Sequence, residues 1–165
     1  MAQLLQITTN EVISGICKAL SGLYGKDVAI YKEKRETLKL PAITCYCIEY
    51  SKTMERFDRF TNVFHIIINY YPQDSLIISN KRTEMFTKAE EIMDAIRYIE
   101  LPAYTKDEHG ELVPTTSLGR ASQMSVEEKE GFMQVYVTYT VRTKQYTENE
   151  CAKTSKLEVN MDIKQ

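Results

Sequence analysis

The fold predicted for this chain rests on one stretch, Phe60-Thr61-Asn62-Val63-Phe64-His65-Ile66-Ile67-Ile68-Asn69-Tyr70-Tyr71. It contains three consecutive isoleucines and four aromatic residues, with no glycine or proline before Pro72, which is typical of a β-strand. Alternate residues form two faces: the even positions are apolar apart from Asn62, whereas the odd positions mix polar and apolar side chains. We therefore expect a strand in the middle of a sheet, with one face on a core and the other against an amphipathic partner.

That second face is where we expect a subunit contact. A later strand, 132–143, also has two faces, with Met133, Val135, Val137, Tyr139 and Val141 on the apolar one. Its outward face joins the odd face of the first strand as a candidate. The predicted interface residues in these two strands are Val63, His65, Ile67, Tyr71 and Tyr136.

Length and composition indicate one soluble globular domain. The chain has 165 residues, of which 43% are hydrophobic and 27% charged. Its formal net charge is -2, so generic polyanion binding, which needs a concentrated basic surface, is not supported. The first residues do not resemble a secretion signal, and no apolar stretch approaches membrane-spanning length. We expect a cytoplasmic protein whose four cysteines are thiols.

Two amphipathic helices are predicted. Thr8 and Glu11 form a capping-box pattern, apolar residues follow at helical spacing, and Gly25 ends the helix. Apolar residues at helical spacing predict a second helix over residues 80–98, with Ser79 as its N-cap.

The remaining elements are predicted as strands and loops. Residues 32–36 and 51–59 are charged connections, 104–114 is a polar loop with a turn at His109-Gly110, and Leu101-Pro102 closes the second helical region. The fold class is α+β: a mostly antiparallel β-sheet with two amphipathic helices packed against it. The predicted strands are 27–31, 40–50, 60–71, 121–127 and 132–143.

The C-terminal segment has its own pattern. Leu157, Val159, Met161 and Ile163 alternate with polar residues, after a polar linker at 147–150. We divide the chain into a domain at 1–144 and a linker with an extended β arm at 145–165, and we add these four apolar residues to the predicted interface. Two interpretations are open: an arm that contacts an adjacent subunit, or a strand that folds back onto its own sheet.

Catalytic and metal-binding patterns are weak. Cys45 and Cys47 are the one close cysteine pair, but a zinc site needs two more ligands, so we expect packing residues. Cys17 lies one step off the apolar stripe of its helix, and we expect it to be only partly covered. His65 is expected to be a half-buried hydrogen-bonding residue, and His109 to lie in a solvated turn. We predict no catalytic, cofactor or metal site and no small-molecule substrate; a hydrolase or thiol enzyme using Cys45 or Cys47 is the least favoured alternative.

The tyrosines allow two functions. The chain has eleven tyrosines and no tryptophan, and several of the tyrosines lie on predicted strands. Such a sheet could stack single-stranded nucleic acid bases, as an accessory nucleic-acid-binding domain does. It could equally form a protein contact, where an aromatic body is buried and its hydroxyl bonds at the rim. The absence of a net positive charge favours the protein contact, without direct nucleic-acid recognition.

Four stretches together resemble a known family. They are Ile7–Ile13 before the first helix, Leu40–Tyr46, the Asn69–Pro72 end of the central strand, and Val135–Tyr139. Over residues 7–143 the chain resembles the tail terminator and tail-completion proteins of tailed phages, prophages and phage-tail-like bacteriocins in low-GC Gram-positive bacteria. The resemblance lies in the order of the parts, and it assigns no functional role to any single residue.

The resemblance implies a structural role without catalysis or cofactors. Such proteins have an α+β fold and assemble with copies of themselves into a ring, commonly a hexamer. The ring caps the tail tube, stops its polymerisation and joins it to the head connector or collar. The implied partners are therefore the tube protein, a sheath where there is one, and the connector or collar. Assembly would take place in the bacterial host cytoplasm, before the protein becomes part of the particle.

Overall fold

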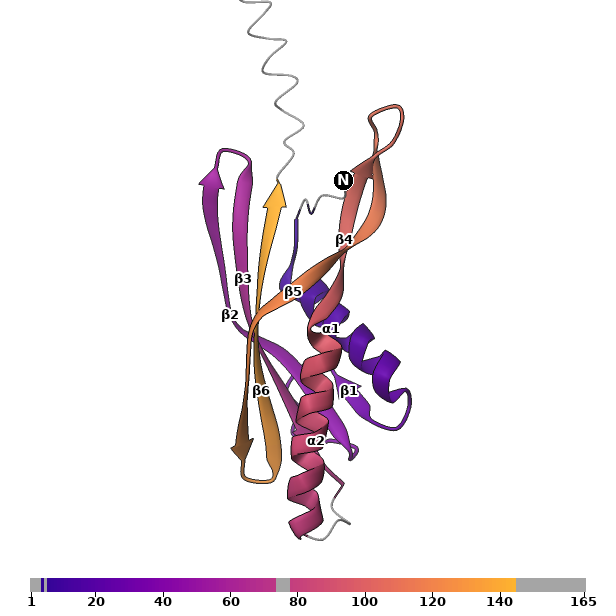
Figure 1. The fold of residues 1–165 in the computed structure, drawn as a ribbon, viewed down its shortest axis with the longest axis vertical. Helices are drawn as coiled ribbons and strands as arrows, with labels where there is room; N and C mark the ends of the chain where they lie inside the picture. Colours follow the sequence, from indigo (N-terminus) through magenta and orange to yellow (C-terminus); the bar gives the residue numbers. More distant parts are fainter. Residues whose placement is uncertain (1–3, 5, 74–77, 145–165) are drawn as a thin grey trace, which may run out of the picture.

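The computed structural model describes residues 4, 6–73 and 78–144, which form one six-stranded sheet and two helices (Figure 1). The strand order is β1-β2-β3-β6-β5-β4. The sheet is mixed, because β1 runs parallel to β2 whereas the other neighbouring strands are antiparallel. The elements are α1 (Thr9–Tyr24), β1 (Ala29–Tyr31), β2 (Ala42–Arg56), β3 (Arg59–Tyr71), α2 (Ile78–Ile96), β4 (Tyr98–Lys106), β5 (Leu112–Lys129) and β6 (Phe132–Lys144).

The central strand is β3, as its sequence predicts. It pairs along its length with β2 on one side and β6 on the other, so that Ile68 lies opposite Cys45 and Val135. Its even positions from Phe64 to Tyr70 are at most 1% exposed. The broad α+β prediction and the buried even face are therefore confirmed.

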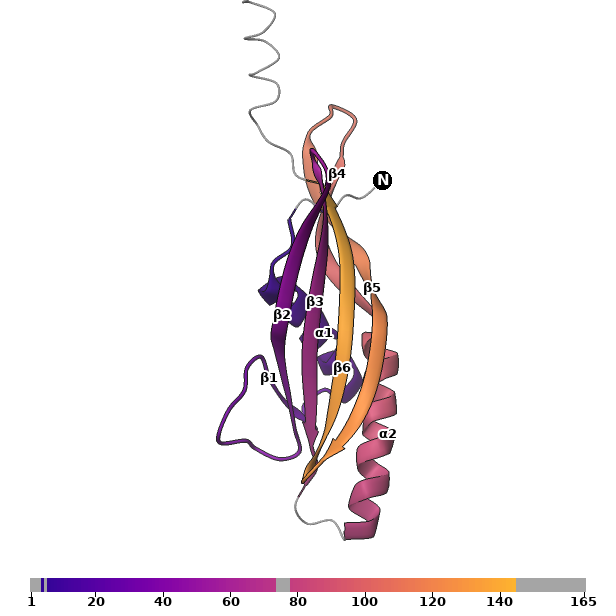
Figure 2. The same cartoon turned by 90° about the vertical axis from the view of Figure 1, so that its left-hand side faces the viewer.

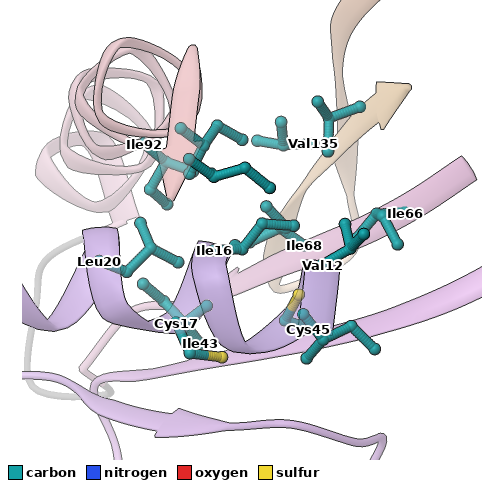
Figure 3. Packing of buried hydrophobic residues seen from close by; sticks show 14 of the residues in the cluster. Val12, Ile16, Cys17, Leu20, Ile43, Cys45, Ile66, Ile68, Ile92 and Val135 are labelled. Carbon is teal, nitrogen blue, oxygen red and sulfur yellow. The ribbon is translucent and has the colours of Figure 1, made fainter. Parts of the chain in front are cut away.

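Both helices pack on this even face (Figure 3). Val12, Ile16 and Leu20 of α1 and Ile92 of α2 are fully buried in one cluster with Ile66 and Ile68 of β3. The start of α1 is fixed by a capping box, in which the Glu11 amide donates to Thr8 Oγ1 over 3.3 Å and the Thr8 amide donates to Glu11 Oε2 over 2.7 Å. These observations confirm the first predicted helix and its capping residues.

The predicted end of the second helix is wrong. α2 begins at Ile78, so Ser79 lies inside it and is not its N-cap. Tyr98 and Leu101-Pro102 belong to β4, in which Ile99, Leu101 and Ala103 are buried at every second position. The apolar pattern therefore changes from helical to strand periodicity after Ile96. Pro102 is tolerated because β4 is an edge strand.

The predicted loop at 104–114 is wrong apart from its turn, because these residues form the outer part of a β-hairpin that is paired as far as Lys106 and Leu112. Tyr104 of β4 lies opposite Pro114 of β5, and a turn near Gly110 joins the strands. β5 then continues: residues 112–120 pair with β4, and residues 121–129 pair with β6. The sequence does not predict this hairpin, because Pro102, Pro114 and many polar residues are untypical of strands.

β2 is longer than its predicted range, and its second half has changed faces. It continues to Arg56, so the predicted connection at 51–59 is reduced to the turn at Phe57-Asp58. A bulge between Cys47 and Glu49 inserts Ile48 and shifts the alternation. Tyr50 therefore stacks on Phe64 of the core face, with ring centroids 4.8 Å apart, instead of sharing the face of Tyr46 as an uninterrupted strand would require.

Cys17 and Cys45 lie where α1 meets β2. Cys17 is only 7% exposed, so the expectation that it is only partly covered is wrong. A residue one step off the apolar stripe of α1 still faces the sheet. Cys45 is fully buried beside Cys17, and this contact together with burial raises the pKa of the Cys45 thiol. Both cysteines are free thiols that pack in the core. The described residues form no cluster of three potential metal ligands.

Gly15 allows α1 to approach β4 closely. A Cβ added there would lie 2.7 Å from the Glu100 carbonyl oxygen and 3.4 Å from Ile99 Cβ. We expect Gly15→Ala to lower the free energy of unfolding by about 1–3 kcal/mol, which outweighs a helix-propensity gain of about 1 kcal/mol. Gly22→Ala in the same helix is the control, because nothing lies within 4 Å of its added Cβ. Urea denaturation showing Gly15→Ala to be as stable as Gly22→Ala would contradict the close packing.

We expect the free energy of unfolding to fall at alkaline pH because of two buried tyrosines, Tyr24 and Tyr70. The Tyr24 hydroxyl donates to Glu91 over 3.1 Å and the Tyr70 hydroxyl to Glu84 over 2.9 Å, and burial together with these carboxylates raises the pKa of both tyrosines. The folded state therefore holds these protons more tightly than the unfolded chain, where tyrosine has a pKa of about 10. Their contribution is complete below about pH 10 and is lost as the pH rises further. Urea denaturation at a series of pH values from neutral to alkaline would measure the free energy of unfolding. It should fall less with rising pH in the double variant Tyr24→Phe, Tyr70→Phe than in the native protein. An equal fall in both proteins would show that these two tyrosines are not its cause.

Candidate assembly surface

The candidate site is the face of the sheet opposite the helices. Both α1 and α2 lie behind the sheet when it is viewed from this side (Figure 2). The register places Ile67 of β3 between Tyr46 of β2 and Tyr136 of β6, so apolar and aromatic side chains adjoin across three strands. We call this the outer face and define it by Tyr46, Val63, His65, Ile67, Tyr71, Phe132, Tyr136 and Thr138.

The structure brings the predicted interface residues of β3 and β6 together on this face. Val63, His65, Tyr71 and Tyr136 are half-buried, and Ile67 is 8% exposed. Their role in a subunit contact remains a prediction. The other four predicted interface residues, Leu157, Val159, Met161 and Ile163, lie outside the described residues.

Two aromatic residues of the outer face escaped the sequence analysis as interface candidates. The Phe132 ring packs against Tyr71 with centroids 4.9 Å apart, and Tyr46 lies beside Ile67. Phe132 begins β6, and the alternation that turns Tyr136 outward places Phe132 on the same face. Tyr46 lies between Cys45 and Cys47, and the same kind of alternation places it away from the buried Cys45.

A hydrogen-bonded row holds the outer face in place across three strands. Gln134 Nε2 of β6 donates to Asn69 Oδ1 of β3 over 2.9 Å. The Tyr136 hydroxyl lies 2.5 Å from Gln134 Oε1 and 3.1 Å from Glu127 Oε2 of β5. Because Asn69 and Gln134 are buried, these partners compensate for their lost hydration. The row fixes the Tyr136 ring in one orientation, as a preformed contact surface requires.

His65 is a hydrogen-bonding residue of this face. Its Nδ1 lies 3.0 Å from the Thr138 hydroxyl on the neighbouring strand, and its side chain is half-buried. This arrangement agrees with the prediction of a half-buried hydrogen-bonding histidine. His109 lies in the β4–β5 turn, where its backbone amide donates to Asp107.

One end of the molecule carries further exposed apolar side chains. The β2–β3 and β4–β5 hairpins both point to this end (Figure 1). Phe57 is 83% exposed at the first tip, and Leu112 and Val113 are each 41% exposed near the second. No periodic pattern marks them in the sequence, because Phe57 lies between Arg56 and Asp58, and Leu112 and Val113 form an isolated pair between Glu111 and Pro114.

Two open pockets lie elsewhere on the described surface, one near the hairpin end and one beside α1. The first, of about 290 Å³, lies near the hairpin end and includes Arg59 and Arg142 in its lining, with Arg142 3.3 Å from Glu55. The second, of about 400 Å³, lies between α1 and β4 and includes Lys18 and Glu100, which form an ion pair. Both linings offer charged, solvent-facing groups, and neither includes a histidine or a cysteine.

A sheet with its helices on one face and a preformed amphipathic surface on the other is typical of a subunit that assembles with other proteins. The model of the family described as phage tail terminator protein matches residues 11–151. The chain therefore belongs to the phage tail terminator family, and it has the structural role in a phage tail that this family fills. A comparison with curated proteins finds no match. Neither described helix is long and apolar enough to cross a membrane.

Proposed function

We propose that this protein forms a ring, a hexamer as is common in such proteins. The ring caps the tail tube, ends its polymerisation and joins it to the head connector or collar. The tail would belong to a phage, a prophage or a phage-tail-like bacteriocin of a Gram-positive host. Family membership supports the position at the tail terminus. The observation that carries the assembly is the outer face, a preformed aromatic surface without a helix over it among the described residues.

The chemistry of the outer face suits a protein partner. Tyr46, Tyr71 and Tyr136 are half-buried, so each presents an apolar ring edge together with a hydroxyl that can bond at the rim of a contact. Ile67 and Val63 supply an aliphatic centre between them. A dry centre with a hydrogen-bonding rim is the usual anatomy of a specific protein interface.

The nucleic-acid alternative is less well supported by the same surface. A sheet that binds single strands combines stacking aromatics with lysine or arginine side chains for the phosphates. The outer face as defined contains neither residue type. Arg142, at its margin, lies 3.3 Å from Glu55, which offsets its charge.

A tube-capping assay tests the proposed function. Purified tube protein would be polymerised with and without this protein, and tube lengths measured by negative-stain electron microscopy. We expect shorter tubes that bear a ring of this protein at one end, with mass photometry giving a single oligomer mass for the released ring. Tubes of unchanged length without terminal density, at a molar excess of this protein, would contradict the proposal.

A further inference from the structure

The outer edge of β2 is the longest unpaired strand edge in the described part of the chain. β1 pairs only with Ala42–Thr44, so residues 45–56 have no neighbouring strand on that side. The apolar side chains Ile48, Tyr50 and Met54 are 53%, 44% and 64% exposed there. A long edge with exposed apolar side chains is a template on which another strand can pair.

Part of this edge is regular enough to accept a strand. Glu49–Met54 pairs with β3 without interruption, between irregularities at Cys47/Glu49 and Met54/Arg56, and we call it the acceptor edge. Six residues span about 20 Å. The other edge strand, β4, is a poorer template, because Pro102 in its middle has no N–H to donate.

We infer that segment 157–163 of a neighbouring copy adds to this edge as a seventh strand of the sheet. The segment alternates apolar and polar residues over seven positions, as a strand with one apolar face does. Asp162, near its end, is acidic, and Lys52 of the acceptor edge is basic.

The outer face continues onto the added strand. Antiparallel pairing with Asp162 opposite Lys52 sets residues 160–163 against 51–54 of the acceptor edge and brings the Asp162 carboxylate beside a cation. The same register sets Met161 beside Thr53 and Ile163 beside Ser51. Because Ser51 and Thr53 pair with Val63 and Thr61, they share the outer face, and the apolar side chains of the segment extend it.

The donor segment starts close to such an edge. Lys144, at the end of β6, lies opposite Arg59, beside the turn where β2 ends. The twelve residues from 145 to 156 can span at most about 40 Å, enough to reach an adjacent subunit. A neighbour is favoured because a ring needs two different, complementary surfaces on each subunit, and a donor segment with an acceptor edge supplies such a pair. The inference thus rests on the proposed ring.

Disulfide trapping between two full-length chains tests the inference. A chain with Thr53→Cys and a chain with Met161→Cys, both also carrying Cys47→Ser and Cys151→Ser, would be mixed, assembled on tube protein and oxidised. We expect a disulfide-linked pair of the two different chains in at least half of the assembled protein. The control replaces Thr53→Cys by Thr105→Cys on the edge strand β4, for which we expect at least tenfold less cross-linking.

The outcomes separate the inference from the proposed function. Equal cross-linking of the Thr105→Cys control would overturn the acceptor edge. A cross-link formed only within one chain that carries both Thr53→Cys and Met161→Cys would overturn the exchange between neighbours. A ring of unchanged mass without any Thr53–Met161 cross-link would overturn the inference and leave the ring standing, whereas the absence of any ring would overturn the proposed function itself.

Discussion

Val63→Glu should abolish ring formation while the protein stays folded. Val63 is a half-buried residue of the outer face, on the central strand and opposite Ser51 and Thr140. A carboxylate there remains hydrated in the isolated subunit but loses water at a contact. The expected cost is about 2 kcal/mol or more per contact, or about 30-fold weaker association. Mass photometry of the protein on tube ends would measure this loss.

The matched control for this substitution is Thr87→Glu. Thr87 is an exposed residue of α2, in the helical layer on the other side of the sheet. It adds the same charge and should leave assembly unchanged. Circular dichroism melting should place both variants close to the native protein. Normal rings from Val63→Glu would show that the outer face is not a subunit contact.

Ile68→Ala should have the opposite consequence, a large loss of stability. Ile68 neighbours Ile67 in sequence but faces the helices, is fully buried, and packs in the cluster with Ile16 and Ile92. Removing its side-chain carbons leaves a cavity in a close-packed core, which costs about 2–5 kcal/mol. Urea denaturation would measure this cost, and the fraction that stays folded should still assemble. A loss below about 1 kcal/mol would contradict the central position of β3 in the core.

The central strand and the first helix could be predicted because their signals are local. The alternation of β3 places its even residues in the core without knowledge of any partner strand. The capping box at Thr8 and Glu11 fixes where α1 begins through contacts three residues apart. In both elements propensity and burial favour the same structure.

The segments that differ from their predicted structure are those in which contacts between distant residues decide the structure. The bulge at Ile48 depends on how β2 and β3 align, and it moves Tyr50 onto the core face. The β4–β5 hairpin contains Pro102 and Pro114, which are tolerated because of where each lies in the sheet. Neither effect can be read from spacing along the chain. The tertiary context therefore overrode the local signal in these segments.

The candidate site likewise contains residues that local alternation predicts and residues whose place depends on distant contacts. The alternation predicted Val63 and Ile67 on one face of β3 and Tyr136 on the outward face of β6, and the register places Tyr136 opposite Ile67. The acceptor edge of β2 could not be predicted, because a free edge is a property of the whole strand order. The exposed Phe57 also shows its place only once the β2–β3 turn is known.

The proposed ring requires above all that the outer face is buried between subunits. Cryo-electron microscopy of assembled tails, resolved to side chains at the terminus, measures this directly. We expect Ile67 and Tyr136 to lie against an adjacent subunit, with Tyr71 at the rim of the contact. A terminal ring in which this face of every subunit is open to solvent would contradict it.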